Sequence, residues 1–508
     1  MKQSSLFIDA AYQYAGFTIQ FTCGLIFYLV IVRMFTVGTV GTVTIFLAII
    51  GLFQILFSFG LGNAAKHFTS FMIGEGSKER IPNIVYKVIL IGSLLGVLSF
   101  VSVFLLSPLL SFYFIHSYNY IGLVRKLGFV IFGYIIFSIL NGVLIGLQNF
   151  RLSSVVSITV WLIYYIGSIV IVISTHSLQS MIIGWILGIY SGVLIELFIL
   201  IRIISKFTSS RQRYSTKSIF VYSVPILLSN LIDYGAAYAD RFIVAAFLST
   251  ASLGVYNFAL LISAAMGLLV MPFNNILMSK FSESFGRSNL GNIGKNVKSS
   301  TLVLSSVFIP GALGISALSS LILYVLGGTS YLLGALPLTV IMFFEAAFVS
   351  FNILTQALSS IRETRVLFIS SAASLFSNLG LSYLLIPTYG LLGAALGYSS
   401  VYVSAFLVLL FHARKKQLVL FDLKGFVKIW TSSLLMYVVL ILATHFFSHL
   451  PIMLPFFFIL GVISYAVFLF LLKPFSKEDS VLILSLFPEN FNSIRKVFAL
   501  FINDPTHQ

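Results

Sequence analysis

The chain has 508 residues, of which 59% are hydrophobic and only 9% are charged. A soluble domain carries roughly 25% charged residues, so this composition excludes a water-soluble protein and predicts an integral membrane protein. The formal net charge of +16 would suit a nucleic-acid partner, but the lysines and arginines fall into alternate loops rather than onto one surface. Nucleic acid is therefore not an expected partner.

Fourteen apolar runs follow one another along the chain, each near the roughly 20 residues that cross hydrocarbon as a helix. The runs are continuous and lack the alternation of barrel strands, so they predict helices and an all-α fold. They lie at 8–32, 39–62, 84–107, 128–148, 154–174, 181–201, 218–246, 254–276, 301–325, 333–357, 366–386, 391–411, 429–447 and 453–472.

The sequence of residues 7–202 recurs after a shift of 213 positions. Scarce residue types carry the match: Gly41 falls on Gly254 and, with a two-residue slip, Asn141 falls on Asn352. Six spans separate the start of the first copy from the start of the second. Because six is even, both copies enter the membrane in the same direction. Such parallel repeats are typical of transporters, in which a site between equivalent halves opens to either side.

The repeat predicts the organisation of the whole chain as two parallel six-helix bundles followed by two extra helices. The expected parts are an N-terminal bundle at 1–206, a basic cytoplasmic linker at 207–217, a C-terminal bundle at 218–416, helices 13 and 14 within 417–475, and a cytoplasmic tail with an interfacial amphipathic helix at 476–508.

The distribution of cations predicts the topology. With a cytoplasmic N-terminus, all but four of the 30 lysines and arginines lie in cytoplasmic segments, the four exceptions being Arg33, Arg125, Lys126 and Arg241. The positive-inside rule produces this asymmetry, and an even number of spans places both termini in the cytoplasm. We expect a multi-pass protein of the cell (plasma) membrane, with anionic membrane lipids beside its basic loops.

The seventh span carries three ionisable residues. Asp233 and Asp240 lie on one helical stripe, and Arg241 adjoins it. An ionisable side chain at a helix centre costs about 2.5–3.5 kcal/mol on insertion scales, so each one needs a reason. Two interpretations stay open: a cavity-facing site for a proton, a cation or a polar headgroup, and a structural pair in which Arg241 reaches outward.

The tenth span places Glu345, Asn352 and Gln356 on one stripe. Asn141 occupies the position of Asn352 in the first copy, so paired amides can line both halves of one cavity. Interhelical hydrogen bonds are the alternative explanation for the same residues, and both interpretations stay open.

Two lysines at the inner ends of spans 2 and 8, Lys66 and Lys280, suit an anionic headgroup that enters from the cytoplasm. Ordinary topology charge is the alternative explanation.

No constellation for enzymatic chemistry is evident. The chain lacks the G-x-x-x-x-G-K-[ST] phosphate-binding loop, and nothing resembles a Ser/His/Asp or zinc site. His445 and His449 have metal-binding spacing but no third ligand nearby. We therefore expect no enzyme, no catalytic residue, no metal and no cofactor. H⁺ or Na⁺ is the expected choice of coupling ion.

Four segments have a recognisable character: FGLGNAAKHF at 59–68, GLQNFR at 146–151, the run at 222–259 and PTYGLLGAALGYSSVY at 387–402. With them the chain resembles the polysaccharide flippases of the MATE/MOP superfamily, the Wzx-type O-antigen and S-layer glycan translocases. The similarity covers roughly residues 1–475 and includes the count of fourteen helices.

This resemblance implies two six-helix bundles around a central V-shaped cavity, with the last two helices beside them. It also implies that a polyprenyl-linked oligosaccharide is transferred from the inner to the outer leaflet. In such proteins an acidic and a basic position on span 7 often face the cavity, and Asp240 and Arg241 match that pattern.

The expected function is therefore that of a flippase for a polyprenyl-linked oligosaccharide in cell-surface polysaccharide or glycoprotein biosynthesis, working by alternating access. Its partners would be this glycolipid, membrane lipids and glycan assembly machinery. Two alternatives stay open: a lipid II-type peptidoglycan precursor flippase and a cation-coupled multidrug or metabolite antiporter of the same superfamily.

Overall fold

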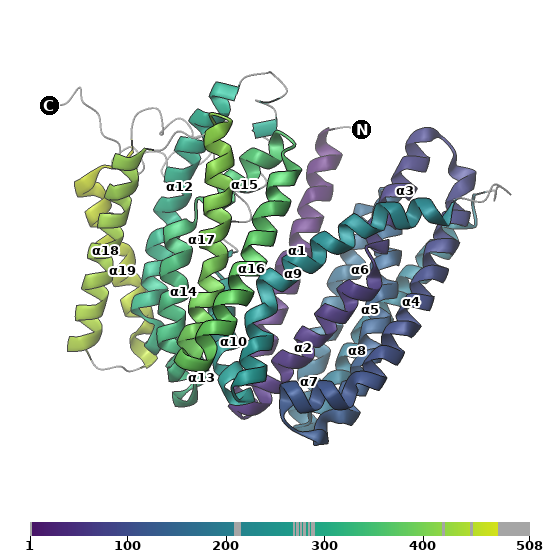
Figure 1. The fold of residues 1–508 in the computed structure, drawn as a ribbon, viewed down its shortest axis with the longest axis horizontal. Helices are drawn as coiled ribbons and strands as arrows, with labels where there is room; N and C mark the ends of the chain where they lie inside the picture. Colours follow the sequence, from purple (N-terminus) through teal and green to yellow (C-terminus); the bar gives the residue numbers. More distant parts are fainter. Residues whose placement is uncertain are drawn as a thin grey trace. The chain divides into compact units, whose positions relative to one another are not determined.

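The computed structural model describes residues 3–207, 215–267, 290–418, 422–447 and 451–475, with isolated positions between 270 and 285. Throughout this part of the chain the regular structure is helical, without a β-strand (Figure 1). Among the described residues, thirteen helices are long and apolar enough to cross a membrane, and α10 (Thr250–Ala264) is a shorter apolar helix. Together they account for the fourteen expected segments and confirm the all-helical membrane fold.

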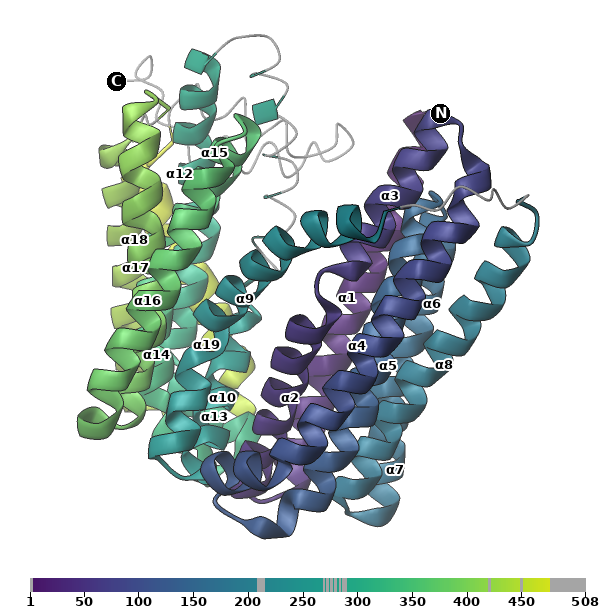
Figure 2. The same cartoon turned by 45° about the vertical axis from the view of Figure 1, so that its right-hand side comes forward.

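The first compact unit comprises Met1–Tyr234 and Ser249–Gly254. At its centre α5 packs against α2, α3, α4 and α8 (Figure 2). Side chains such as Ile131, Leu140 and Leu144 of α5 are completely buried, as expected of a helix covered on several sides. The helices of this unit are α1 (Gln3–Met34), α2 (Val37–Ser58), α3 (Leu61–Glu75), α4 (Ile81–Leu110), α5 (Ile121–Gly146), α6 (Phe150–Leu162), α7 (Ser168–Thr175) and α8 (Leu178–Ile204).

The second unit comprises Gly235–Leu248 and Val255–Gln508, so α9 (Thr216–Phe247) contributes to both units. Its last two helices pack against α12, where the Tyr465 hydroxyl donates to the Ser306 carbonyl at 2.7 Å. The remaining helices are α12 (Leu290–Ala317), α13 (Ser319–Gly327), α14 (Ala335–Phe348), α15 (Phe351–Ser360), α16 (Thr364–Tyr389), α17 (Leu391–Lys415), α18 (Leu423–Phe446) and α19 (Leu454–Leu472).

The helix boundaries repeat with the same shift as the sequence. Helices α1 and α9 both have 32 residues, and they start at Gln3 and Thr216, 213 positions apart. The starts of α2 and α10 are separated by the same interval, as are those of α8 and α17. The helix boundaries therefore follow the sequence repeat.

Two equivalent glycines of the repeat contact one another. A Cβ atom added to Gly41 would overlap the Thr250 carbonyl oxygen, and one added to Gly254 would overlap the Val37 carbonyl oxygen. Val37 and Thr250 are themselves 213 positions apart, so the contact is symmetric. Only glycine lets the two backbones approach this closely, as at the small-residue crossings of other membrane helices.

One exposed ion pair connects the start of α16 with the end of α17. Lys416 Nζ lies 2.6 Å from Glu363 Oε1, and Glu363 is the N-cap residue of α16. The hydrogen bond from Lys416 holds the pKa of Glu363 below its usual value. The stabilisation from this ion pair is fully present above the pKa that Glu363 has in the unfolded chain. It is lost as the pH falls through the lower pKa that Glu363 has in the folded protein. Because the pair is exposed, salt screens it.

Candidate functional site

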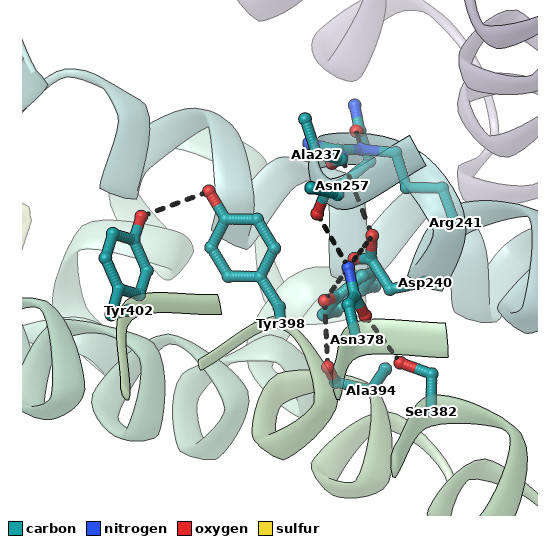
Figure 3. Close-up of polar contacts among 11 residues, drawn as sticks. Ala237, Asp240, Arg241, Asn257, Asn378, Ser382, Ala394, Tyr398 and Tyr402 are labelled. Atoms are coloured by element: carbon teal, nitrogen blue, oxygen red, sulfur yellow. Dashed lines mark hydrogen bonds and ion pairs between the residues drawn. The ribbon is translucent and has the colours of Figure 1, made fainter. Parts of the chain in front are cut away.

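Asp240 lies completely buried on α9, inside the second unit. Its Oδ2 accepts a hydrogen bond from the Tyr256 hydroxyl of α10 at 2.6 Å, and its Oδ1 lies 3.5 Å from the Asn378 amide nitrogen of α16 (Figure 3). Three helices thus converge on one carboxylate. A buried carboxylate is tolerated only with such partners, because hydrocarbon offers none.

The Tyr256 hydroxyl lies between two acceptors. It is 2.6 Å from Asp240 Oδ2 and 3.1 Å from the Ala394 carbonyl oxygen of α17. A phenol hydroxyl has only one hydrogen to donate. When Asp240 is ionised, this hydrogen points to the carboxylate. When Asp240 is protonated, the acid can donate to Tyr256, which then donates to Ala394. The arrangement therefore accommodates both charge states of Asp240.

Asn378 extends the network along α16. Its amide nitrogen donates to the Ala236 carbonyl at 2.9 Å, and its amide oxygen accepts from the Ser382 hydroxyl at 2.8 Å (Figure 3). Asn378 and Ser382 are both fully buried. These bonds fix the amide orientation and connect α9 to α16.

Arg241 is held beside Asp240 rather than reaching outward alone. Its Nε donates to the Asn257 side-chain oxygen at 2.9 Å, one terminal nitrogen lies 3.8 Å from Asp240 Oδ1, and the same nitrogen bonds the Ala237 carbonyl. The guanidinium also lies 4.2 Å from the centre of the Tyr238 ring. Its side chain remains 12% exposed, so part of the cation can be reached from outside the unit's core.

Glu345 forms a second buried acidic centre, on α14. Its Oε1 accepts from the hydroxyls of Ser263 and Tyr402, each at 2.6 Å. The Tyr402 hydroxyl lies 3.2 Å from that of Tyr398, one turn earlier on α17 (Figure 3). In Figure 3 the Tyr398 side chain lies between Tyr402 and the residues around Asp240. The two acidic centres thus belong to one polar layer of the second unit.

Other predicted residues lie apart from this layer. Asp233 is exposed on α9 and has no hydrogen bond or ion pair in the described part of the chain. The tenth span is divided, so that Glu345 lies on α14 whereas Asn352 and Gln356 lie on α15. The Asn352 amide bonds the nearby Val349 carbonyl at 3.3 Å. The single stripe expected from the sequence is therefore broken.

In the first unit, Asn141 of α5 pairs with a buried acid. Its amide nitrogen donates to Glu196 Oε1 of α8 at 2.7 Å, while Oε2 of the fully buried Glu196 has no hydrogen-bond partner among the described residues. Asn141 thus acts in an interhelical hydrogen bond.

Lys66 and Lys280 are the two lysines predicted to contact a headgroup. Lys66 is exposed on α3, which is compatible with either a headgroup contact or topology charge. Lys280 lies outside the described residues.

Sequence reasoning found the charges of the polar layer but missed its uncharged members, Tyr256, Asn378, Tyr398 and Tyr402. One signal was available: Tyr398 and Tyr402 have i, i+4 spacing and therefore share a helix face. The amide of Asn378 inside an apolar helix was another.

Comparison with known proteins identifies related sequences and folds. A family model described as polysaccharide biosynthesis protein matches residues 30–335. No match was found among curated proteins.

Several solved membrane transporters share the fold. The lipid II flippase MurJ, in an inward closed conformation, matches with a TM-score of 0.73 and 18% identity over 90% of this chain and 97% of that one. An inward-facing multidrug resistance MATE transporter of the MOP superfamily matches with a TM-score of 0.65 and 16% identity, over 78% of this chain and 95% of that one. A MOP superfamily transporter from Pyrococcus furiosus matches with a TM-score of 0.56 and 14% identity, over 80% of this chain and 94% of that one.

Proposed function

Because the chain belongs to the polysaccharide biosynthesis protein family, we propose that it is a flippase that moves a polyprenyl-linked oligosaccharide from the cytoplasmic to the outer leaflet of the cell membrane. The observation that carries the proposal is the family match, made to a chain whose described residues include 13 membrane-length helices. The proteins that share its fold are transporters and flippases rather than enzymes.

The physical problem in this reaction is the headgroup. Transfer of sugars and phosphates into hydrocarbon costs several kcal/mol of free energy for each polar group left without a hydrogen bond. The apolar polyprenyl tail has no such cost. Alternating access lets a protein shelter the headgroup while the tail stays in lipid, and duplicated parallel bundles are suited to it. Membrane lipids would be constant partners, and glycan assembly machinery would supply the substrate at the cytoplasmic face.

We further propose that an H⁺ or Na⁺ gradient acts at Asp240. The carboxylate and an anionic headgroup both attract a guanidinium, so they would compete for Arg241. A cation bound at Asp240 weakens its hold on Arg241, 3.8 Å away, and frees the guanidinium for phosphate. The two hydrogen-bond arrangements of Tyr256 support the proposal, because both charge states of Asp240 retain partners.

The test is a leaflet-resolved assay in proteoliposomes that contain a polyprenyl pyrophosphate-linked oligosaccharide. The wild-type protein should expose the glycan to an added glycosidase faster than empty vesicles do, and an imposed H⁺ or Na⁺ gradient should increase the rate. With Asp240→Asn, which keeps the shape but cannot ionise, this increase should disappear.

The outcomes separate the alternatives. If the protein does not speed exposure of any of several glycans over empty vesicles, the flippase proposal itself is wrong. Movement of lipid II but of no other glycolipid would assign the peptidoglycan substrate. Uptake of small organic cations that depends on Asp233 would instead favour the antiporter. An undiminished gradient effect in Asp240→Asn would remove only the coupling role.

A further inference from the structure

A cavity of about 650 Å³ lies at the end of the first unit where α2, α5 and α8 begin. Its walls come from Phe35 and Thr39, from the start of α5 at 119–126 and from the α7–α8 connection at 176–179. The volume falls within the range of small-molecule sites. The predicted topology assigns this end to the outer side of the membrane.

Lys126 gives the cavity its charge. It is half-buried in the wall, and no described residue forms an ion pair or hydrogen bond with its ammonium group. The neighbouring Arg125 is different, because its Nε donates to Ser107 Oγ at 3.2 Å and its guanidinium lies 4.3 Å from the centre of the Phe104 ring. Arg125 therefore has a structural role, whereas Lys126 remains available.

The other lining groups suit an anion that carries hydroxyl groups. Asn119 and Gln179 provide amides, His176 an imidazole and Tyr120 an aromatic ring. None of the lining residues is acidic. The positive dipole ends of three helices lie at the same wall and add to the attraction for negative charge.

We propose that this cavity binds the phosphate-bearing headgroup of a lipid, with Lys126 contacting the phosphate and the amides contacting hydroxyls. A charge-assisted bond from lysine to phosphate is the strongest single contact available here. The site lies within the first unit, apart from the Asp240 layer of the second. Lipid binding at this cavity does not depend on transport. A protein that binds no lipid here can still be a flippase, and a protein that transports nothing can still bind lipid here.

The test is a binding titration by native mass spectrometry on the full-length protein in detergent. Phosphatidylglycerol is the probe, diacylglycerol is the same lipid without phosphate, and glycerol phosphate is the headgroup without lipid. The wild-type protein should retain phosphatidylglycerol over diacylglycerol. Lys126→Gln should weaken this binding about tenfold, which corresponds to the loss of one charge-assisted hydrogen bond.

Two further variants keep the result interpretable. Lys126→Arg preserves the charge and should retain most of the binding, which excludes misfolding as the cause. Lys424→Gln removes an exposed lysine of the second unit and should change nothing. Competition by glycerol phosphate would show that the headgroup alone suffices, and its absence that the acyl chains contribute. Equal binding by Lys126→Gln and the wild-type protein, or an equal loss in Lys424→Gln, would overturn the proposal.

Discussion

Two acids are buried among the described residues of the second unit, and they have different kinds of partner. Asp240 has a cation, Arg241, 3.8 Å from its Oδ1. The hydrogen bonds of Glu345 come from two hydroxyls, those of Ser263 and Tyr402. The contribution of Glu345 to stability therefore rests on its ability to accept hydrogen bonds rather than on charge pairing.

This difference leads to a prediction for substitutions at Glu345. Glu345→Ala leaves two hydroxyls without their acceptor and should cost about 1–3 kcal/mol for each buried group that stays unsatisfied. Glu345→Gln keeps one acceptor oxygen and should cost less. The melting temperature of the purified protein in detergent measures both. Tyr402→Phe should cost little more once Glu345 is alanine, because the bond is already lost. Additive losses would contradict a direct interaction.

At the residue scale, the sequence identified the charged members of this site but not their neighbours. Asp240, Arg241 and Glu345 stand out because charges are costly in apolar spans. Tyr256 and Tyr402 do not, since tyrosine is common in membrane helices for other reasons. Their roles depend on which helices meet in three dimensions. The same is true of burial: Asp233 and Asp240 share one stripe of α9, yet Asp233 is exposed and Asp240 is buried.

At the scale of whole elements, the close crossing of α2 and α10 predicts a strong steric effect. Gly41→Ala places a methyl group on the Thr250 carbonyl oxygen, and the helices must separate to accommodate it. Such overpacking typically costs about 1–3 kcal/mol. Thermal unfolding of the purified variant should therefore begin at a lower temperature than that of the wild-type protein.

A matched control is available for this substitution. Gly380 lies inside α16, and a Cβ atom added there would meet nothing within 4 Å. Gly380→Ala should leave the melting temperature unchanged or raise it slightly, because alanine favours helix over glycine. An equal decrease in both variants would mean that helix flexibility, and not the close approach at Gly41, sets the stability.

Helix positions followed well from hydrophobic runs, but breaks within runs did not. The run at 333–357 reads as one span, whereas the structure has two helices, α14 and α15, that meet between Phe348 and Phe351. No proline or glycine marks the break. Backbone bonds from Asn352 and Ile353 to carbonyls three residues earlier tighten the turn, a local rearrangement that hydropathy cannot detect.

For the molecule as a whole, the charge distribution predicts a topology that one native residue makes easy to test. Cys23 is the only cysteine, and it is buried, with 7% of its surface exposed. A membrane-impermeant maleimide should therefore leave the wild-type protein unlabelled. Thr388→Cys introduces an exposed thiol in a predicted outer connection, and Ser205→Cys introduces one in a predicted cytoplasmic connection.

With a cytoplasmic N-terminus, Thr388→Cys should react in intact cells, and Ser205→Cys only after the membrane is permeabilised. The positive-inside rule is the reason, since it predicts that the basic connection after α8 stays in the cytoplasm. Labelling of Ser205→Cys alone in intact cells would invert the topology, and with it the proposed direction of transport.

The meeting of Gly41 with Gly254 also has an evolutionary consequence. Each glycine contacts the backbone of the other's helix through equivalent residues, the pattern of an isologous interface in a two-fold symmetric dimer. In this chain the two positions can mutate separately, yet each glycine depends on the small size of the other. A substitution at either position therefore acts on the same contact.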